Sequence, residues 1–153
     1  MQGSVGVGPV KAVPLESEIV DRSTARRRLA DAKTGYLATL TVELRPHIVP
    51  CCFALKANTL YSAVDAKPKR TPDLRRVQNL RANASCSLLV DHYDEDWTTL
   101  WWIRVDGSGR VVENMDEWSV ARELLAGKYE QYRTTPPPGP VLAIEIERWR
   151  TWP

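Results

Sequence analysis

The stretch GYLATLTVELRPHIVPCCFAL, residues 35–55, decides the fold. It contains two β-rich runs, 35–42 and 45–55, with two residues between them. Such runs are typical of strands, and the short connection predicts a tight antiparallel hairpin. Because proline cannot donate a backbone hydrogen bond, Pro46 and Pro50 predict that the second strand lies at a sheet edge or carries a bulge near Pro50.

Further strands are predicted along the rest of the chain. The β-rich runs are 59–65, 84–94, 98–107 and 141–152. Residues 107–109, Gly-Ser-Gly, are interpreted as a turn that leads into a short strand at 110–113. The order contains no alternating strand-helix-strand repeat of a parallel sheet, so we expect a mainly β (α+β) fold: an antiparallel split β-barrel with flanking helices.

The first two helices are predicted from local signals at their ends. Ser23 is expected to cap a helix that runs to about Ala32, with Gly35 as the glycine that follows a helix end. Thr71 and Pro72 are expected as the N-cap and first residue of a short second helix.

The third helix has the clearest start. Asn114, with Glu117 three residues later, resembles a capping box, and an apolar stripe continues the helix to about Arg133. Residues 134–140 include three consecutive prolines and are expected to form an extended linker before the last strand, 141–152.

Length and charge set limits on function. The chain has 153 residues, enough for one domain with a core, and 21 Lys and Arg against 19 Asp and Glu. This balance does not indicate a nucleic-acid partner, and no run is long enough for a membrane span. We expect a cytoplasmic protein with a flexible arm at residues 1–14 and a single cofactor-binding domain at 15–153.

The three cysteines are odd in number and have no zinc-type spacing. Cys51 and Cys52 are adjacent on a predicted strand, where successive side chains point to opposite faces, so they are not expected to pair. We interpret these two and Cys86 as free thiols, and we predict no metal site.

The segment LYSAVDAKPKRTPDLRRVQNLRANASCSLLV, residues 60–90, carries the functional signal. Five cations fall within ten residues at a strand end and a helix start: Lys67, Lys69, Arg70, Arg75 and Arg76. Helical geometry places Arg75, Arg76 and Asn79 away from Leu74 and Val77. Basic side chains beside a helix N-terminus favour a phosphate, although a solvated basic face is the alternative. A second basic run, 26–28, is expected to face solvent.

These motifs resemble the split-barrel flavin and deazaflavin oxidoreductases, which are similar to pyridoxamine 5'-phosphate oxidase. GYLATL, RPHIVP, LYSAVDAKPKRT, LRRVQNLRAN and SLLVDHYDEDW extend the resemblance over most of residues 35–113. Within that superfamily the chain looks like the actinobacterial group of probable coenzyme F420-dependent enzymes. The residues TPDL lengthen the gap between KPKR and LRRVQN, which leaves open which basic cluster holds the phosphate.

The resemblance implies an obligate homodimer, a small-molecule substrate and a cofactor held against strand backbone. The cofactor-binding residues that it implies are Val49, Pro50, Ser62, Val64, Lys67, Lys69, Arg70, Arg75, Arg76 and Asn79. The deazaflavin would move a hydride, so no catalytic side chain is predicted. His47 and His92 remain open as proton donors, and Trp97, Trp101 and Trp102 as walls of a substrate pocket. The alternatives are an FMN-dependent oxidase or reductase and a non-catalytic cofactor-binding or carrier protein.

Overall fold

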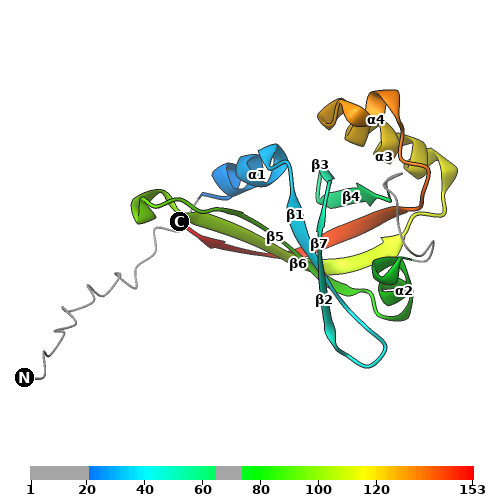
Figure 1. The fold of residues 1–153 in the computed structure, drawn as a ribbon, viewed down its shortest axis with the longest axis horizontal. Coiled ribbons are helices and arrows are strands. Elements are labelled where there is room, and N and C mark those ends of the chain that lie inside the picture. The colour runs from blue at the N-terminus through cyan, green and yellow to red at the C-terminus, as the bar shows by residue number, and fades with distance from the viewer. Residues whose placement is uncertain (1–20, 65–73) are drawn as a thin grey trace, which may run out of the picture.

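Seven strands form one curled antiparallel sheet in the order β2-β1-β5-β6-β7-β4-β3 (Figure 1). The computed structural model describes residues 21–64 and 74–153, so the predicted arm at 1–14 lies outside the described residues. The mainly β, antiparallel fold with flanking helices is confirmed. The elements are α1 (Arg22–Asp31), β1 (Gly35–Leu40), β2 (Pro46–Cys51), β3 (Ala54–Lys56), β4 (Thr59–Ala63), α2 (Arg75–Ala82), β5 (Ser85–His92), η1 (Trp97–Thr99), β6 (Trp101–Val111), α3 (Met115–Lys128), α4 (Gln131–Thr134) and β7 (Val141–Trp152).

β1 and β2 form the predicted hairpin, and β2 is an edge strand, as Pro46 and Pro50 indicated. The connection is wider than predicted. The Thr41 N–H donates to the Arg45 carbonyl over 3.0 Å, and Leu44 adopts a positive φ of 59°. The chain therefore reverses through the three residues between Thr41 and Arg45. The left-handed conformation of Leu44 lets this loop follow the right-handed twist of the two strands.

Two glycines that the sequence assigned to helix ends or turns lie within strands. Gly35 begins β1, where a Cβ would lie 2.9 Å from the Leu88 side chain. β6 continues through residues 107–109, so the predicted turn there is wrong. Gly107 lies at a register shift, and a Cβ there would lie 2.0 Å from the Glu145 carbonyl oxygen. Close packing between strands, rather than a turn, requires glycine at both positions.

α3 begins at Asn114 as predicted, because the Asn114 side chain accepts the Glu117 N–H over 2.9 Å, while the Glu117 carboxylate accepts from Arg110 and Tyr61 rather than from the Asn114 N–H. The helix ends at Lys128, earlier than predicted, and the short α4 follows. The Arg133 guanidinium donates to the carbonyls of Ala126 and Gly127, at 2.9 and 3.2 Å. These bonds satisfy two carbonyls that the end of the helix leaves free.

Two apolar clusters lie on opposite faces of the sheet. The inner cluster joins the sheet to α1 and α2 and includes Leu29, Leu37 and Leu80. On the outer face, α3 and α4 cover β3, β4 and part of β7, with Ala121 and Leu125 fully buried. Neither helix of that pair packs against β1, β2 or β5. Within residues 21–64 and 74–153, no helix has the length and apolar character to cross a membrane.

Candidate functional site

α2 carries three of the described candidate residues and packs against β1 and β6. Asn79 is buried, and its Nδ2 donates to Thr39 Oγ1 over 2.9 Å. The prediction that Asn79 lies on the outward face is therefore wrong. That prediction oriented the helix on Leu74, but Leu74 is the N-cap and the buried face is centred near Leu80. The predicted capping residues 71 and 72 lie outside the described residues.

The rotation also turns Arg76 partly inward, because Arg76 lies between Leu80 and Asn79 around the helix at about 100° per residue. Six buried polar atoms have no hydrogen-bond partner in the described part of the chain, and three of them belong to α2, β4 and β2: Arg76 Nε, Ser62 Oγ and His47 Nδ1. Buried polar atoms in proteins are nearly always paired, so an unpaired group of them indicates a place for a bound molecule.

Electrostatic interactions link these residues across three elements. Burial, followed by the charges of Arg75 and Arg76, lowers the pKa of His47, so this imidazole is neutral at pH 7. Burial raises the pKa of Cys51 to about 11, while the Ser62 hydroxyl and Arg76 act in the opposite direction. Arg76 therefore acts electrostatically on residues at both ends of β2, His47 and Cys51, and Ser62 of β4 acts on Cys51. We call Arg76, Ser62 and His47 the polar triad.

Sequence reasoning selected two members of the triad as cofactor-binding residues and considered His47 only as a possible proton donor. The missed signal was strand alternation, because His47 and Cys51 share a face of β2 with Val49, which was selected. All three cysteines are free, as predicted.

The other candidate residues lie in different surroundings. Pro50 is exposed on the opposite face of β2 from Val49, and Arg75 is exposed on α2. Val64 is buried, and its backbone N–H and carbonyl pair with Pro140 and Gly139 at 3.0 and 3.1 Å. Val64 can therefore contribute a wall but no backbone hydrogen bond. Three further candidates lie outside the described residues: Lys67, Lys69 and Arg70.

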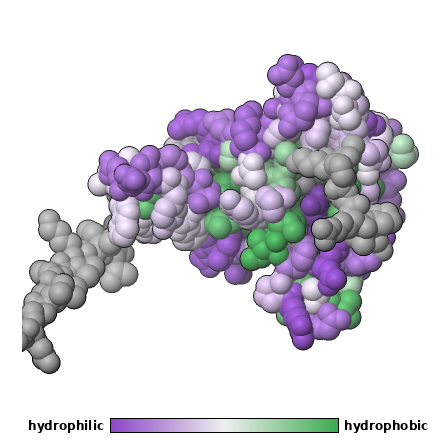
Figure 2. All heavy atoms as spheres, viewed as in Figure 1, coloured by the Kyte–Doolittle hydropathy of each residue, from purple (hydrophilic) through white to green (hydrophobic). Residues whose placement is uncertain are grey.

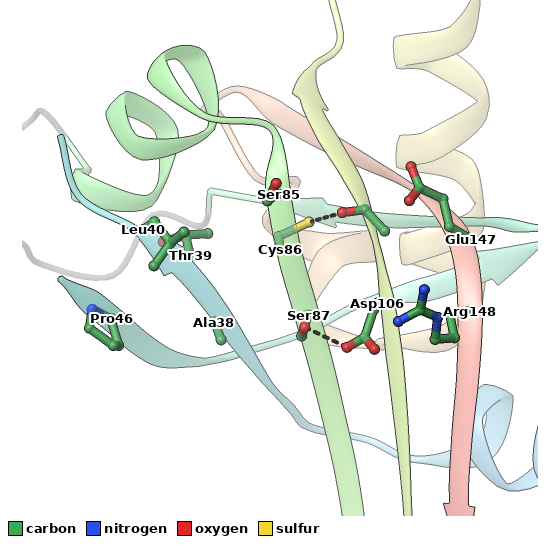
Figure 3. Close-up of a pocket in the computed structure, with 11 residues that line it drawn as sticks. Ala38, Thr39, Leu40, Pro46, Ser85, Cys86, Ser87, Asp106, Glu147 and Arg148 are labelled. Atoms are coloured by element: carbon green, nitrogen blue, oxygen red, sulfur yellow. Dashed lines mark hydrogen bonds between the residues drawn. The ribbon is translucent and has the colours of Figure 1, made fainter. Parts of the chain in front are cut away.

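A groove with a volume of about 470 Å³ lies on the outer face of the sheet (Figure 3). It forms where β1 and β5 diverge beyond the Ala38–Ser87 pair. None of the seven candidate residues that the structure describes lines it. Asp106 in its wall accepts from Ser87 Oγ at 2.7 Å and pairs with Arg104 at 3.0 Å.

The two concave regions differ in charge. The outer groove combines Asp106 and Glu147 with a single arginine, Arg148, so it has no excess positive charge for a phosphate. At the polar triad, by contrast, Arg75 and Arg76 act on a neutral histidine. An anionic ligand is favoured at the triad and not in the groove.

Comparisons with known proteins agree with this fold. Residues 22–153 match the family described as pyridoxamine 5'-phosphate oxidase. Similar solved structures include conserved hypothetical protein Rv2991 of Mycobacterium tuberculosis, at 18% identity and TM-score 0.72, covering 88% of this chain and 85% of that one. A FAD-binding protein of Mesorhizobium loti has 19% identity and TM-score 0.66, with 86% and 94% covered. The heme storage protein HutZ of Vibrio cholerae has 14% identity and TM-score 0.66, with 86% and 92% covered.

At these identities the structural likeness concerns the fold alone, and no curated protein matches the sequence. The family match, however, spans nearly all of the described chain. The curled antiparallel sheet and its flanking helices are consistent with it. The chain therefore belongs to the pyridoxamine 5'-phosphate oxidase family.

Proposed function

We propose that this protein is an oxidoreductase that uses coenzyme F420 to transfer a hydride to a small organic acceptor. The proposal combines the sequence resemblance with one observation, the polar triad of buried, unpaired atoms beside the arginines of α2. Arg76 Nε and Ser62 Oγ are hydrogen-bond donors, and phosphate oxygens are acceptors. The donor set therefore fits a phosphate-bearing cofactor.

In this proposal the chain contributes binding and orientation. Arg76 and Ser62 hold the anionic part of the cofactor, and the exposed Arg75 adds charge at the entrance. Lys67, Lys69 and Arg70 lie outside the described residues, and we assign them from the sequence alone to the anionic tail of the cofactor. Val49 shares the His47 face of β2 and lies beside the ring, whereas Pro50 on the opposite face contributes only strand backbone. When bound, the deazaflavin supplies the hydride chemistry.

His47 has a separate role in this scheme. Its lowered pKa keeps the ring neutral, so one ring nitrogen carries a proton and the other does not. A neutral imidazole donates a hydrogen bond to the ligand without adding charge. His47 is thus the described residue that we assign to orienting the cofactor.

Two alternatives use the same fold. FMN also carries a phosphate that the triad fits, which gives an FMN-dependent oxidase or reductase. A non-catalytic carrier is the other alternative, since solved relatives of this fold include proteins named for FAD binding and for heme storage. The three possibilities differ in their ligand and in turnover, so a direct comparison of ligands separates them.

The test titrates purified protein with F420, FMN and hemin at fixed salt, following cofactor fluorescence or absorbance. We expect F420 to bind most tightly and to be oxidised or reduced with quinone-like or unsaturated acceptors. Tighter binding of FMN, together with turnover, would identify FMN rather than F420 as the cofactor. Tight hemin binding without turnover would favour the carrier.

Arginine variants supply a matched control within the same chain. Each direct charge-assisted contact contributes about 1.5 to 3 kcal/mol, so Arg76→Ala should weaken F420 binding roughly ten- to a hundredfold. Arg27→Ala removes an exposed arginine of α1 and should change little. Lys69→Ala shows how much F420 affinity depends on the basic residues that follow the third predicted strand, for comparison with Arg76 on the helix. Equal small losses in all three variants would contradict a phosphate site and indicate a diffuse basic field.

We also propose that the protein is a homodimer, with the uncovered outer face of β1 and β2 as the contact. Tyr36 and Ile48 on this face are 45% and 63% exposed. Figure 2 shows apolar side chains gathered near the middle of the visible face, where these strands cross. Burying such side chains stabilises a two-fold dimer. Sedimentation equilibrium should give twice the 17.3 kDa chain mass, and a monomer at micromolar concentration would refute this.

A further inference from the structure

Four of the six tryptophans gather where β6 begins and β7 ends, on the side of the molecule away from α2 (Figure 1). Trp101 and Trp149 pack against the inner apolar cluster. Trp102 and Trp152 are direct cross-strand neighbours. Because side chains alternate along a strand, this second pair lies on the outer face.

Each inner tryptophan is covered by an arginine of α1. The Arg22 guanidinium carbon lies 5.4 Å from the centre of the Trp149 ring, and that of Arg28 lies 4.9 Å from the centre of Trp101. The prediction that Arg28 faces solvent is therefore wrong. Both distances are within the range of cation–π interactions. At this end of the sheet, therefore, two guanidinium groups lie over the faces of tryptophan rings.

The outer pair has no such cation. Among residues 21–64 and 74–153, no lysine or arginine lies over the ring of Trp102 or Trp152. Arg104, the nearest arginine along β6, is engaged with Asp106 at 3.0 Å. Arg150 is the cross-strand neighbour of Arg104 in the next row on this face, and its charge opposes a cationic ligand there.

A pocket of about 180 Å³ opens at this position, with four aromatic side chains among its five lining residues. The lining residues are Tyr93, Leu100, Trp101, Trp102 and Trp152. Its volume is below the roughly 300–1,000 Å³ of pockets that hold larger ligands, so it suits a small head group. Asp91 is the cross-strand neighbour of Trp102, and three more exposed carboxylates follow β5 in the segment that contains Tyr93 of the pocket wall: Asp94, Glu95 and Asp96.

We propose that this aromatic pocket binds the guanidinium group of a small organic cation, held by Trp102 and Trp152. The guanidinium of the ligand would lie over the outer tryptophan rings, as the guanidinium groups of Arg22 and Arg28 lie over the inner ones. The carboxylates attract it, and the ring faces select a flat cation over a neutral group of the same shape. The site is separate from the polar triad and does not depend on the cofactor.

The test titrates the full chain with N-acetylarginine amide and, as a neutral isostere, N-acetylcitrulline amide. Tryptophan indole N–H resonances report the contact by NMR. We expect saturable shifts at the indoles of Trp102 and Trp152 in the millimolar range, with citrulline at least about tenfold weaker. Trp102→Leu should abolish saturation. Trp97→Leu removes an indole that is 77% exposed and outside the pocket, and should leave binding unchanged.

Charge variants change the affinity for the arginine probe in opposite directions. Arg150→Gln should tighten arginine binding by several-fold, because it removes the opposing cation. Asp94→Asn with Glu95→Gln should weaken it at low salt. Equal affinity for the two probes, shifts spread over all six indoles, or no saturation would each overturn the proposal. The probe pair is measured on the unaltered chain, so an unfolded variant cannot decide the result.

Discussion

Gly107→Ala is the substitution that the structure predicts to be most damaging. Gly107 lies where β6 and β7 shift register, and an added Cβ would be 2.0 Å from the carbonyl oxygen of Glu145. The obstructing atom is backbone, so it cannot rotate away, and β7 must move by about 1 Å or more to restore ordinary contact. The shift would disturb β6 and β7, which share the longest ladder in the sheet.

Overpacking of this kind costs about 1–3 kcal/mol and occasionally more, and a fixed backbone obstacle belongs at the upper end. We expect a loss of about 3–5 kcal/mol in the free energy of unfolding. For a domain of this size that corresponds to a decrease in Tm of roughly 6–20 °C. The control is Gly127→Ala in α3, where nothing lies within 4 Å of the new Cβ. It should stabilise by about 0.5–1 kcal/mol, since alanine favours a helix.

Urea denaturation and thermal melting of both variants measure the two effects side by side. The informative quantity is the difference between the variants, because it cancels errors of extrapolation that affect each value. A Gly107→Ala protein within about 0.5 kcal/mol of the parent would show that β6 and β7 do not approach as described. Destabilisation by Gly127→Ala would show that α3 does not continue to Lys128.

The remaining predictions concern a buried tyrosine, an ion pair and a thiol. Tyr129→Phe removes the hydroxyl that accepts the Phe53 N–H at 2.9 Å, and calorimetry should show a loss of about 1–3 kcal/mol. Hydrogen bonds from Arg110 lower the pKa of Glu117 below 4.5, so the stability that this pair contributes is present above pH 4.5 and is lost as the pH falls through the lowered pKa. Glu117→Gln should reduce this loss of stability at acid pH, as measured by denaturation at a series of pH values. Cys52 should react first with iodoacetamide, because burial raises the pKa of the other two thiols to about 11 and about 12; peptide mass mapping that finds another cysteine modified first would contradict this.

Part of the candidate site was accessible from the sequence. The basic segment identified Arg76, and the family resemblance implied Ser62; both act on the Cys51 thiol in the structure. His47 was considered only as a proton donor, because a strand histidine alone carries no sign of which neighbours it will meet. Asn79 was misassigned because the helix was oriented on Leu74, and only contact with Thr39 reveals the buried face.

The sequence by itself determined the features that depend on neighbouring residues. The hairpin at the sheet edge follows from the spacing of two β-rich runs and from prolines that cannot donate, and α3 begins at Asn114 because its side chain accepts a hydrogen bond three residues on. Local chemistry is sufficient in both cases. The roles of Gly35 and Gly107, the stacking of Arg28 on Trp101 and the inward turn of Arg76 were decided by tertiary structure. Each depends on an atom that is distant in the chain and becomes a neighbour only when the sheet closes.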